Sequence, residues 1–122
     1  MRLVPAAVVV AAAALLTAPV CAAPVVPSRV QVTAKEFWLS LSRRTVLEGP
    51  AIVQLVNFGE DPHDLRLRRI GGTKVYRTPV VDPGDYYDLS LKLHAGRYRL
   101  WCKVANHEAL GMKAILVVRK RR

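Results

Sequence analysis

Short runs in which apolar and polar side chains alternate extend over most of the chain from residue 30 onward. Successive side chains of a β-strand point to opposite faces of a sheet, so this pattern predicts half-buried strands. The alternating runs are 30–34, 37–42, 65–68, 86–93, 97–102 and 112–119, and residues 51–58 form a mostly apolar run. Glycine-containing turns separate several runs, and the stretch from Gly72 to Val81 is the least patterned. No segment has a helical period, so we expect an all-β, antiparallel Greek-key β-sandwich of about eight strands.

The N-terminal residues differ in composition from the rest of the chain. Arg2 is followed by an apolar run from Leu3 to Leu16 and then by small residues up to Ala22. This order is typical of a secretory signal peptide. We therefore predict a signal peptide at 1–22, a short linker at 23–29, the folded domain at 30–118 and a basic C-terminal tail at 119–122.

Two alternatives exist for the N-terminal segment. An uncleaved membrane anchor wants about 20 uninterrupted apolar residues, whereas Pro5 and Pro19 interrupt this run. Lipid modification of Cys21 is disfavoured because Ala18-Pro19-Val20 is an unusual sequence before a lipidated cysteine. The sequence thus predicts an exported protein, periplasmic, extracellular or at the cell surface, with no stable membrane insertion after cleavage.

The formal net charge of the chain is +10. Such a balance suits nucleic acid, an anionic surface or an acidic partner protein. Nucleic acid is excluded by the predicted export and by the lack of interleaved basic and aromatic residues. The densest basic run, Arg119 to Arg122, is interpreted as a solvated tail. We therefore expect an acidic protein partner, which the positive charge would attract by electrostatic steering.

Cleavage after residue 22 would leave Cys102 as the single cysteine of the mature chain. Exported domains use cysteine mostly in disulfides, which a lone cysteine cannot form internally. Cys102 is therefore a buried small hydrophobe, a reactive thiol or a metal ligand. Metal ligation would also shield the thiolate from oxidation.

A set of metal-ligand residue types surrounds this cysteine. Cys102, His107 and Met112 follow one another with four residues in each gap, and His63 lies upstream. One thiolate, two imidazoles and a weak thioether are the donors that a type 1 copper ion uses. Zinc also binds His and Cys, but a thioether is a poor zinc ligand. The alternative without a metal is that these residues fill the core and its loops.

The alternation pattern also predicts where these side chains point. His63 has the parity of Leu65, Cys102 that of Leu100, and Met112 that of Leu116, which are all predicted core positions. Three of the four residues would thus face the core at strand ends, while His107 lies in the loop before the last strand. The four side chains can therefore meet at one end of the sandwich interior.

Two motifs contain the candidate ligands: Asn57-x-Gly59-x-x-x-His63, and Gly96-Arg97-Tyr98-Arg99-Leu100-Trp101-Cys102 followed by His107 and Gly111-Met112. These motifs resemble those of the cupredoxins, the small blue copper proteins. The two four-residue gaps are similar to rusticyanin and azurin-like members more than to plastocyanin. The resemblance implies a Greek-key sandwich, one type 1 copper ion, and a one-electron shuttle. Asn57 and Asp64 are candidates for hydrogen bonds that hold the His63 loop.

The leading interpretation is an exported, monomeric electron carrier with His63, Cys102, His107 and Met112 around one copper ion. Its redox partner would be a protein such as an acidic cytochrome or oxidase. A copper-handling chaperone or scavenger, and a metal-free binding module, are the alternatives. An enzyme is disfavoured, since further copper centres need more than the three histidines present. We also expect an apolar rim of Ala105, Ala109 and Leu110 that leaves the His107 edge accessible.

Overall fold

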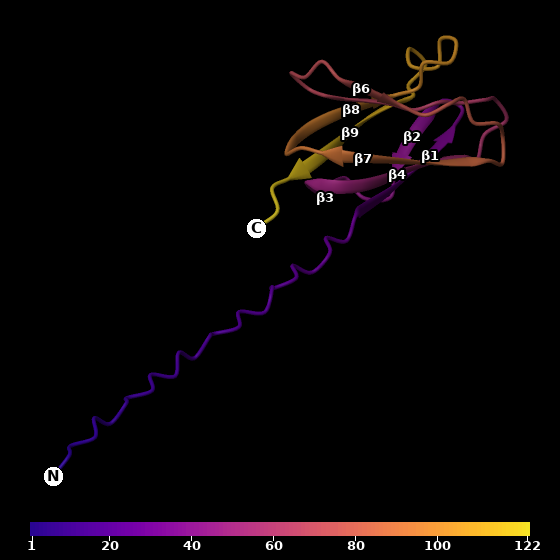
Figure 1. Cartoon of the computed structure of the whole chain (residues 1–122). Coiled ribbons are helices and arrows are strands. Elements are labelled where there is room, and N and C mark those ends of the chain that lie inside the picture. Colours follow the sequence, from indigo (N-terminus) through magenta and orange to yellow (C-terminus); the bar gives the residue numbers. More distant parts are fainter.

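The computed structural model describes residues 1–122, and all of its secondary structure is β (Figure 1). The strands are β1 (Ser28–Lys35), β2 (Trp38–Leu41), β3 (Thr45–Leu47), β4 (Gly49–Asn57), β5 (Arg66–Arg69), β6 (Val75–Arg77), β7 (Tyr86–Leu93), β8 (Gly96–Trp101) and β9 (Lys113–Arg119). The all-β prediction is confirmed, with nine strands rather than about eight. The added strands, β3 and β6, have three residues each, too few for a recognisable alternation.

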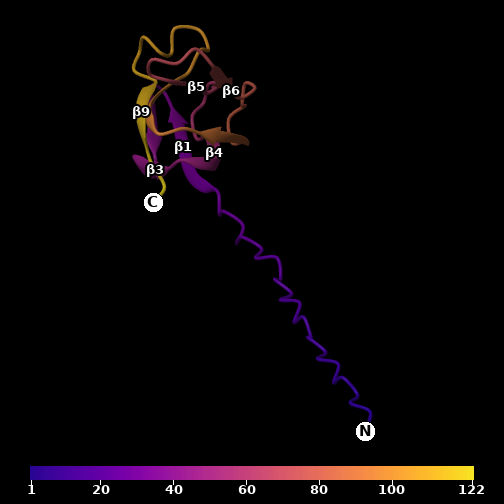
Figure 2. The same ribbon diagram turned by 60° about the vertical axis from the view of Figure 1, so that its left-hand side comes forward.

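The strands form two sheets that pack into a sandwich (Figures 1 and 2). One sheet has the order β2-β1-β4-β7 and the other β3-β9-β8-β5-β6. Neighbours are antiparallel except for β1–β4 and β3–β9, which are parallel. The expectation of an antiparallel sandwich is wrong for these two pairs. Side chains alternate in the same way in both kinds of pair, so the pattern does not encode strand direction.

The core lies between the sheets and follows the predicted parity. Leu65, Leu67 and Leu100 are completely buried, and Tyr98 is 1% exposed. Burying one such leucine contributes roughly 1.5–3 kcal/mol relative to leaving it in water. The Tyr98 hydroxyl accepts a hydrogen bond from the backbone N–H of His94 at 3.0 Å, so its polar atom is also satisfied.

The N-terminal segment stands apart from this sandwich. Residues 1–27 have no helix or strand and extend away from the sheets as a long tail (Figures 1 and 2). The first residue of the buried core is Val30. No helix in the structure combines the length and hydropathy needed to cross a bilayer. The proposed cleavage after residue 22 and the segment boundaries stay predictions.

Several strands end at the same pole of the sandwich. Ala34 and Asn57 are paired near the ends of β1 and β4. In the other sheet, Trp101 pairs with both Arg66 and Lys113, so the end of β8 lies beside the starts of β5 and β9. The connections at this pole are residues 36–37, 58–65, 78–85 and 102–112, and we call it the loop pole.

Candidate metal centre

Three of the predicted ligands meet inside the loop pole. His63 and Cys102 are completely buried, and His107 is 6% exposed. The Nδ1 atoms of the two histidines are 3.2 Å apart. The Cys102 Sγ lies 4.0 Å from the Nδ1 of His63 and 3.8 Å from that of His107. The structure thus brings together donors separated by up to 44 residues in the chain.

These separations fit a shared cation. Zinc–nitrogen distances of about 2.0 Å and zinc–thiolate distances of about 2.3 Å imply donor separations of roughly 3.5–3.8 Å at trigonal angles. The observed range of 3.2–4.0 Å brackets these values. Two imidazole nitrogens and one sulfur are also the equatorial donor chemistry of a type 1 copper ion. His63, Cys102 and His107 could therefore hold a metal ion.

Met112 lies beside this group and is completely buried. Its carbonyl accepts a hydrogen bond from the N–H of Cys102, and its own N–H donates to the carbonyl of His107, both at 3.1 Å. The backbone thus fixes Met112 against two of the three donors. Its predicted place in the core is confirmed, and its role as the weak axial ligand stays a prediction.

Asn57 secures the loop that carries His63. It is completely buried at the end of β4. Its Nδ2 donates to the carbonyls of Asp61 at 2.8 Å and Val81 at 2.9 Å, and its Oδ1 accepts from the N–H of Gly59 at 2.8 Å. His63 is itself paired with Val81 through two backbone hydrogen bonds. The expected locking role of Asn57 agrees with these contacts.

Asp64 connects the two loops that carry His63 and Cys102. The residue is 5% exposed. Its Oδ1 accepts a hydrogen bond at 2.6 Å from the backbone N–H of Lys103. The residues following the two candidate ligands are therefore bonded to each other, which limits their relative movement.

The turn between β1 and β2 adds two residues that the sequence analysis assigned no role at the site. Oε1 of Glu36 lies 2.9 Å from Nε2 of His63. The Phe37 ring packs on His107 with 5.0 Å between centroids. Hydrogen bonds, first of all from the N–H of Asp61, lower the pKa of Glu36 from 4.5 to about 2. No local pattern could reveal these contacts, since Glu36 and His63 are 27 positions apart.

The Cys102 thiol is completely buried. Burial raises its pKa above the ordinary value of 9.0, because desolvation disfavours the thiolate. A bound cation would reverse this preference, since a coordinating thiol is deprotonated. The buried cysteine therefore suits a metal ligand better than a reactive thiol, which needs stabilisation of its thiolate and exposure.

The surface near His107 agrees only in part with the expected apolar rim. Ala105, Ala109 and Leu110 are exposed, and Leu110 retains 50% of its accessible surface. His107 itself shows little surface, because Phe37 covers it and a carboxylate oxygen of Asp61 lies 3.5 Å from its Nε2. The accessible edge of His107 is consequently narrow.

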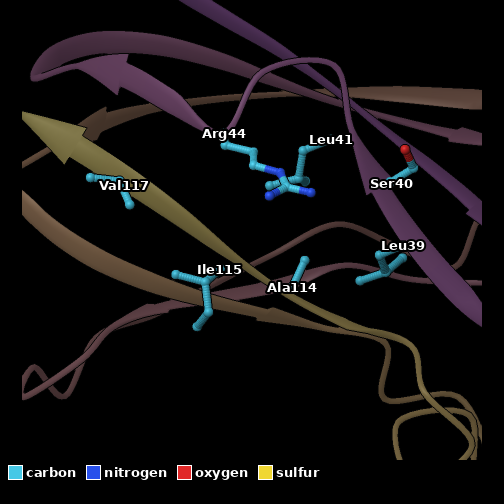
Figure 3. A pocket seen from close by; sticks show the side chains of 7 residues that line it. All are labelled: Leu39, Ser40, Leu41, Arg44, Ala114, Ile115 and Val117. Carbon is cyan, nitrogen blue, oxygen red and sulfur yellow. The ribbon is translucent and has the colours of Figure 1, made fainter.

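The remaining candidate features lie outside the centre. His94 is exposed, as expected for a surface histidine. Trp101 is half-buried on the outer face, with the Arg99 guanidinium 4.8 Å from its ring centroid. A surface groove between β2 and β9 is lined by apolar side chains together with Ser40 and Arg44 (Figure 3). It includes none of the candidate ligands.

Comparison with known proteins identifies the architecture. No family model and no curated protein sequence matches the chain. Among solved structures, it is similar to a dithionite-reduced auracyanin from Roseiflexus castenholzii, with a TM-score of 0.62, 15% identity and coverage of 75% of this chain and 97% of that one. Auracyanin A, a "blue" copper protein from Chloroflexus aurantiacus, matches with a TM-score of 0.59, 12% identity and coverage of 76% and 99%.

A purple cupredoxin from Nitrosopumilus maritimus is also similar, with a TM-score of 0.53, 16% identity and coverage of 73% of this chain and 98% of that one. A blue copper oxidase matches over 40% of its own length. The coverage of the small proteins is nearly complete, so the similarity describes a whole domain. The chain therefore has the cupredoxin fold, with a candidate metal centre of buried His63, Cys102 and His107 at its loop pole.

Proposed function

We propose that this protein is an exported electron carrier that holds one type 1 copper ion through His63, Cys102, His107 and Met112. The observation that carries the proposal is the convergence of two imidazole Nδ1 atoms on one thiol inside a cupredoxin fold. Such a donor set is tolerable to both Cu(I) and Cu(II). When bound, the copper would supply a one-electron redox couple.

The protein's own contribution is a rigid and dry pocket. Backbone hydrogen bonds link Cys102 to Met112 and Met112 to His107, and the Asp64 carboxylate links the loops that carry His63 and Cys102. Donors held this firmly need little rearrangement when the oxidation state of a bound ion changes. The complete burial of Cys102 excludes water from the thiolate, and control of solvent access in this way tunes a redox potential.

The test is to purify the chain without residues 1–22, none of which belongs to the core, and add Cu(II). We expect intense absorption toward the red end of the visible spectrum, bleached by a reductant, and a paramagnetic resonance signal that disappears with it. Cys102→Ser is the control, since it removes the thiolate and should abolish the colour. A colourless wild-type protein after metal loading would contradict the proposal.

Copper handling is the competing role for the same site. A chaperone or scavenger must release its ion, whereas the candidate ligands here are almost fully buried. We therefore expect a weak chelator to leave the loaded protein coloured for hours. Loss of copper to such a chelator within minutes would favour the handling role over electron transfer.

The redox partner is proposed to be an acidic protein. Basic side chains gather on the outer face of the β5–β6–β8–β9 region. The strand register places Arg77, Arg66 and Lys113 in one row across the sheet, with Trp101 between Arg66 and Lys113, and it pairs Arg68 with Arg99 in the next row. This concentration of positive charge would attract an acidic cytochrome or oxidase and raise the association rate. A monomer suits this role, because a carrier must expose its surface to its partners.

A further inference from the structure

The turn between β1 and β2 places a carboxylate directly behind one candidate ligand. Oε1 of Glu36 lies 2.9 Å from Nε2 of His63 and accepts hydrogen bonds from the N–H groups of Glu60 at 2.9 Å and Asp61 at 2.7 Å. One oxygen thus joins the β1–β2 turn, the loop after β4 and a histidine of the centre. The Glu36 side chain is 26% exposed, so these contacts are partly shielded from water.

The donor and acceptor roles in this contact can be assigned. An ionised carboxylate only accepts hydrogen bonds, so the proton of a neutral His63 ring must lie on Nε2. Its Nδ1 then presents a lone pair toward the Nδ1 of His107 and the Sγ of Cys102. Carboxylates that bind the outer nitrogen of a ligating histidine in this way fix its tautomer and raise its basicity.

The fit of Glu36 depends on a glycine. A Cβ built on Gly59 would clash with Oε1 of Glu36 and lie 2.7 Å from its Oε2. Any larger residue would therefore push the carboxylate away from His63. Asn57 also holds the N–H of Gly59, so the position of this glycine is set by the same loop that carries the histidine.

The two histidines differ in this respect. Nε2 of His107 has a carboxylate oxygen of Asp61 only at 3.5 Å, and the Asp61 side chain is 49% exposed. A long, exposed contact of this kind contributes little. Of the two histidines, only His63 therefore has a carboxylate at short hydrogen-bond distance from its Nε2.

We propose that Glu36 is a positioning residue that selects the Nε2–H tautomer of His63, orients its Nδ1 into the centre and, through its fixed negative charge, favours Cu(II) over Cu(I). The tautomer selection stands on the contacts alone, while the effect on copper rests on the proposed function. The β1–β2 turn is then a third segment that contributes to the centre, beside the His63 loop and the 102–112 loop.

The test compares Glu36→Ala, which removes the acceptor, and Glu36→Gln, which keeps an oxygen but removes its charge. Glu60→Gln is the matched control, because it removes a neighbouring charge and leaves the backbone donor in place. In the metal-free protein, nitrogen NMR should find His63 as the Nε2–H tautomer in the wild type and a tautomer mixture in Glu36→Ala. Circular dichroism checks that each variant folds.

With copper, Glu36→Ala should bind Cu(II) about 10 to 100 times more weakly than the wild type, as measured by chelator competition. Glu36→Gln should shift the reduction potential to a more positive value, and Glu60→Gln should change neither property. The inference would be overturned if both Glu36 variants kept the His63 tautomer of the wild type and also bound Cu(II) as tightly as the wild type. An equal loss of affinity in Glu60→Gln would do the same, since the effect would then be one of loop charge in general. Failure of the wild type to bind Cu(II) would instead defeat the proposed function, and the NMR comparison would still decide the tautomer.

Discussion

At the scale of single residues, the loop pole depends on two glycines that let other groups approach closely. Gly59 admits the Glu36 carboxylate, and Gly111 admits the Phe37 carbonyl, which lies 2.8 Å from the position of a Gly111 Cβ. Gly111 also has a φ of +124°, a conformation that residues with a Cβ rarely adopt. Because Gly111 precedes Met112, its backbone affects the position of a candidate ligand.

We predict that Gly111→Ala destabilises the protein by more than about 1 kcal/mol beyond the cost of Gly84→Ala. Gly84 has a φ of +85° but no atom within 4 Å of a built Cβ, so it measures the conformational cost without the clash. Urea unfolding of both metal-free variants provides the comparison. Equal free energies of unfolding would show that the contact with Phe37 is relieved without cost.

At the scale of elements, the centre is assembled from connections held by two rigid sheets. The 102–112 loop supplies Cys102, His107 and Met112, and its backbone is closed by hydrogen bonds from the N–H groups of His107 to Val104 and of Gly111 to Glu108. The exposed residues of this loop include the apolar Ala105, Ala109 and Leu110, together with the polar Lys103 and Asn106.

We predict that Leu110→Glu slows electron exchange while leaving the copper absorption intact. Leu110 is 50% exposed, so the change should alter stability by less than about 0.5 kcal/mol while placing a charge beside the narrow His107 edge. Stopped-flow electron transfer with a small protein partner measures the rate. Leu47→Glu is the control, because Leu47 is 42% exposed and lies in β3, away from the loop pole. If the two variants exchange electrons at the same rate, the rim has no role in exchange.

At the scale of the whole molecule, charge is distributed unevenly over the sandwich. The outer face of the β5–β6–β8–β9 region carries the aligned arginines. Two of these arginines form ion pairs, Arg66 with Asp64 and Arg99 with Glu108. In the other sheet, polar uncharged residues such as Gln31, Thr33 and Ser90 share the outward positions with charged ones. The aligned rows of basic residues thus belong to the outer face of the β5–β6–β8–β9 region.

We predict that the rate of electron transfer to an acidic partner falls steeply as salt is raised, because exposed charges are screened within about 10 Å at 0.1 M ionic strength. A basic partner should show the opposite trend. Replacing Arg66, Arg68 and Arg77 by Gln should flatten the salt dependence with the acidic partner. A flat response for both partners in the wild-type protein would remove electrostatic steering as an explanation.

Some features of this fold depend on neighbouring residues along the chain, and others depend on segments far apart in the sequence. The all-β class and the buried side of most strands follow from alternation, which is a property of neighbouring residues. Tyr87 is an exception: it has core parity but remains 40% exposed. β7 is the edge strand of its sheet, so its inner face is only partly covered. The sequence of one strand does not reveal whether that strand will have a neighbour on both sides of it in the sheet. The expected closeness to rusticyanin and azurin-like members stays a prediction.

The sequence by itself determined the candidate donor set of this protein, since the types and spacing of His63, Cys102, His107 and Met112, and the core parity of three of them, can all be read along the chain. Only the tertiary structure decided which groups surround them. The parallel pairing of β1 with β4 and the contact of Glu36 with His63 join residues more than 20 positions apart. Such contacts arise from the packing of the two sheets as a whole, and the pattern within one segment carries no record of them.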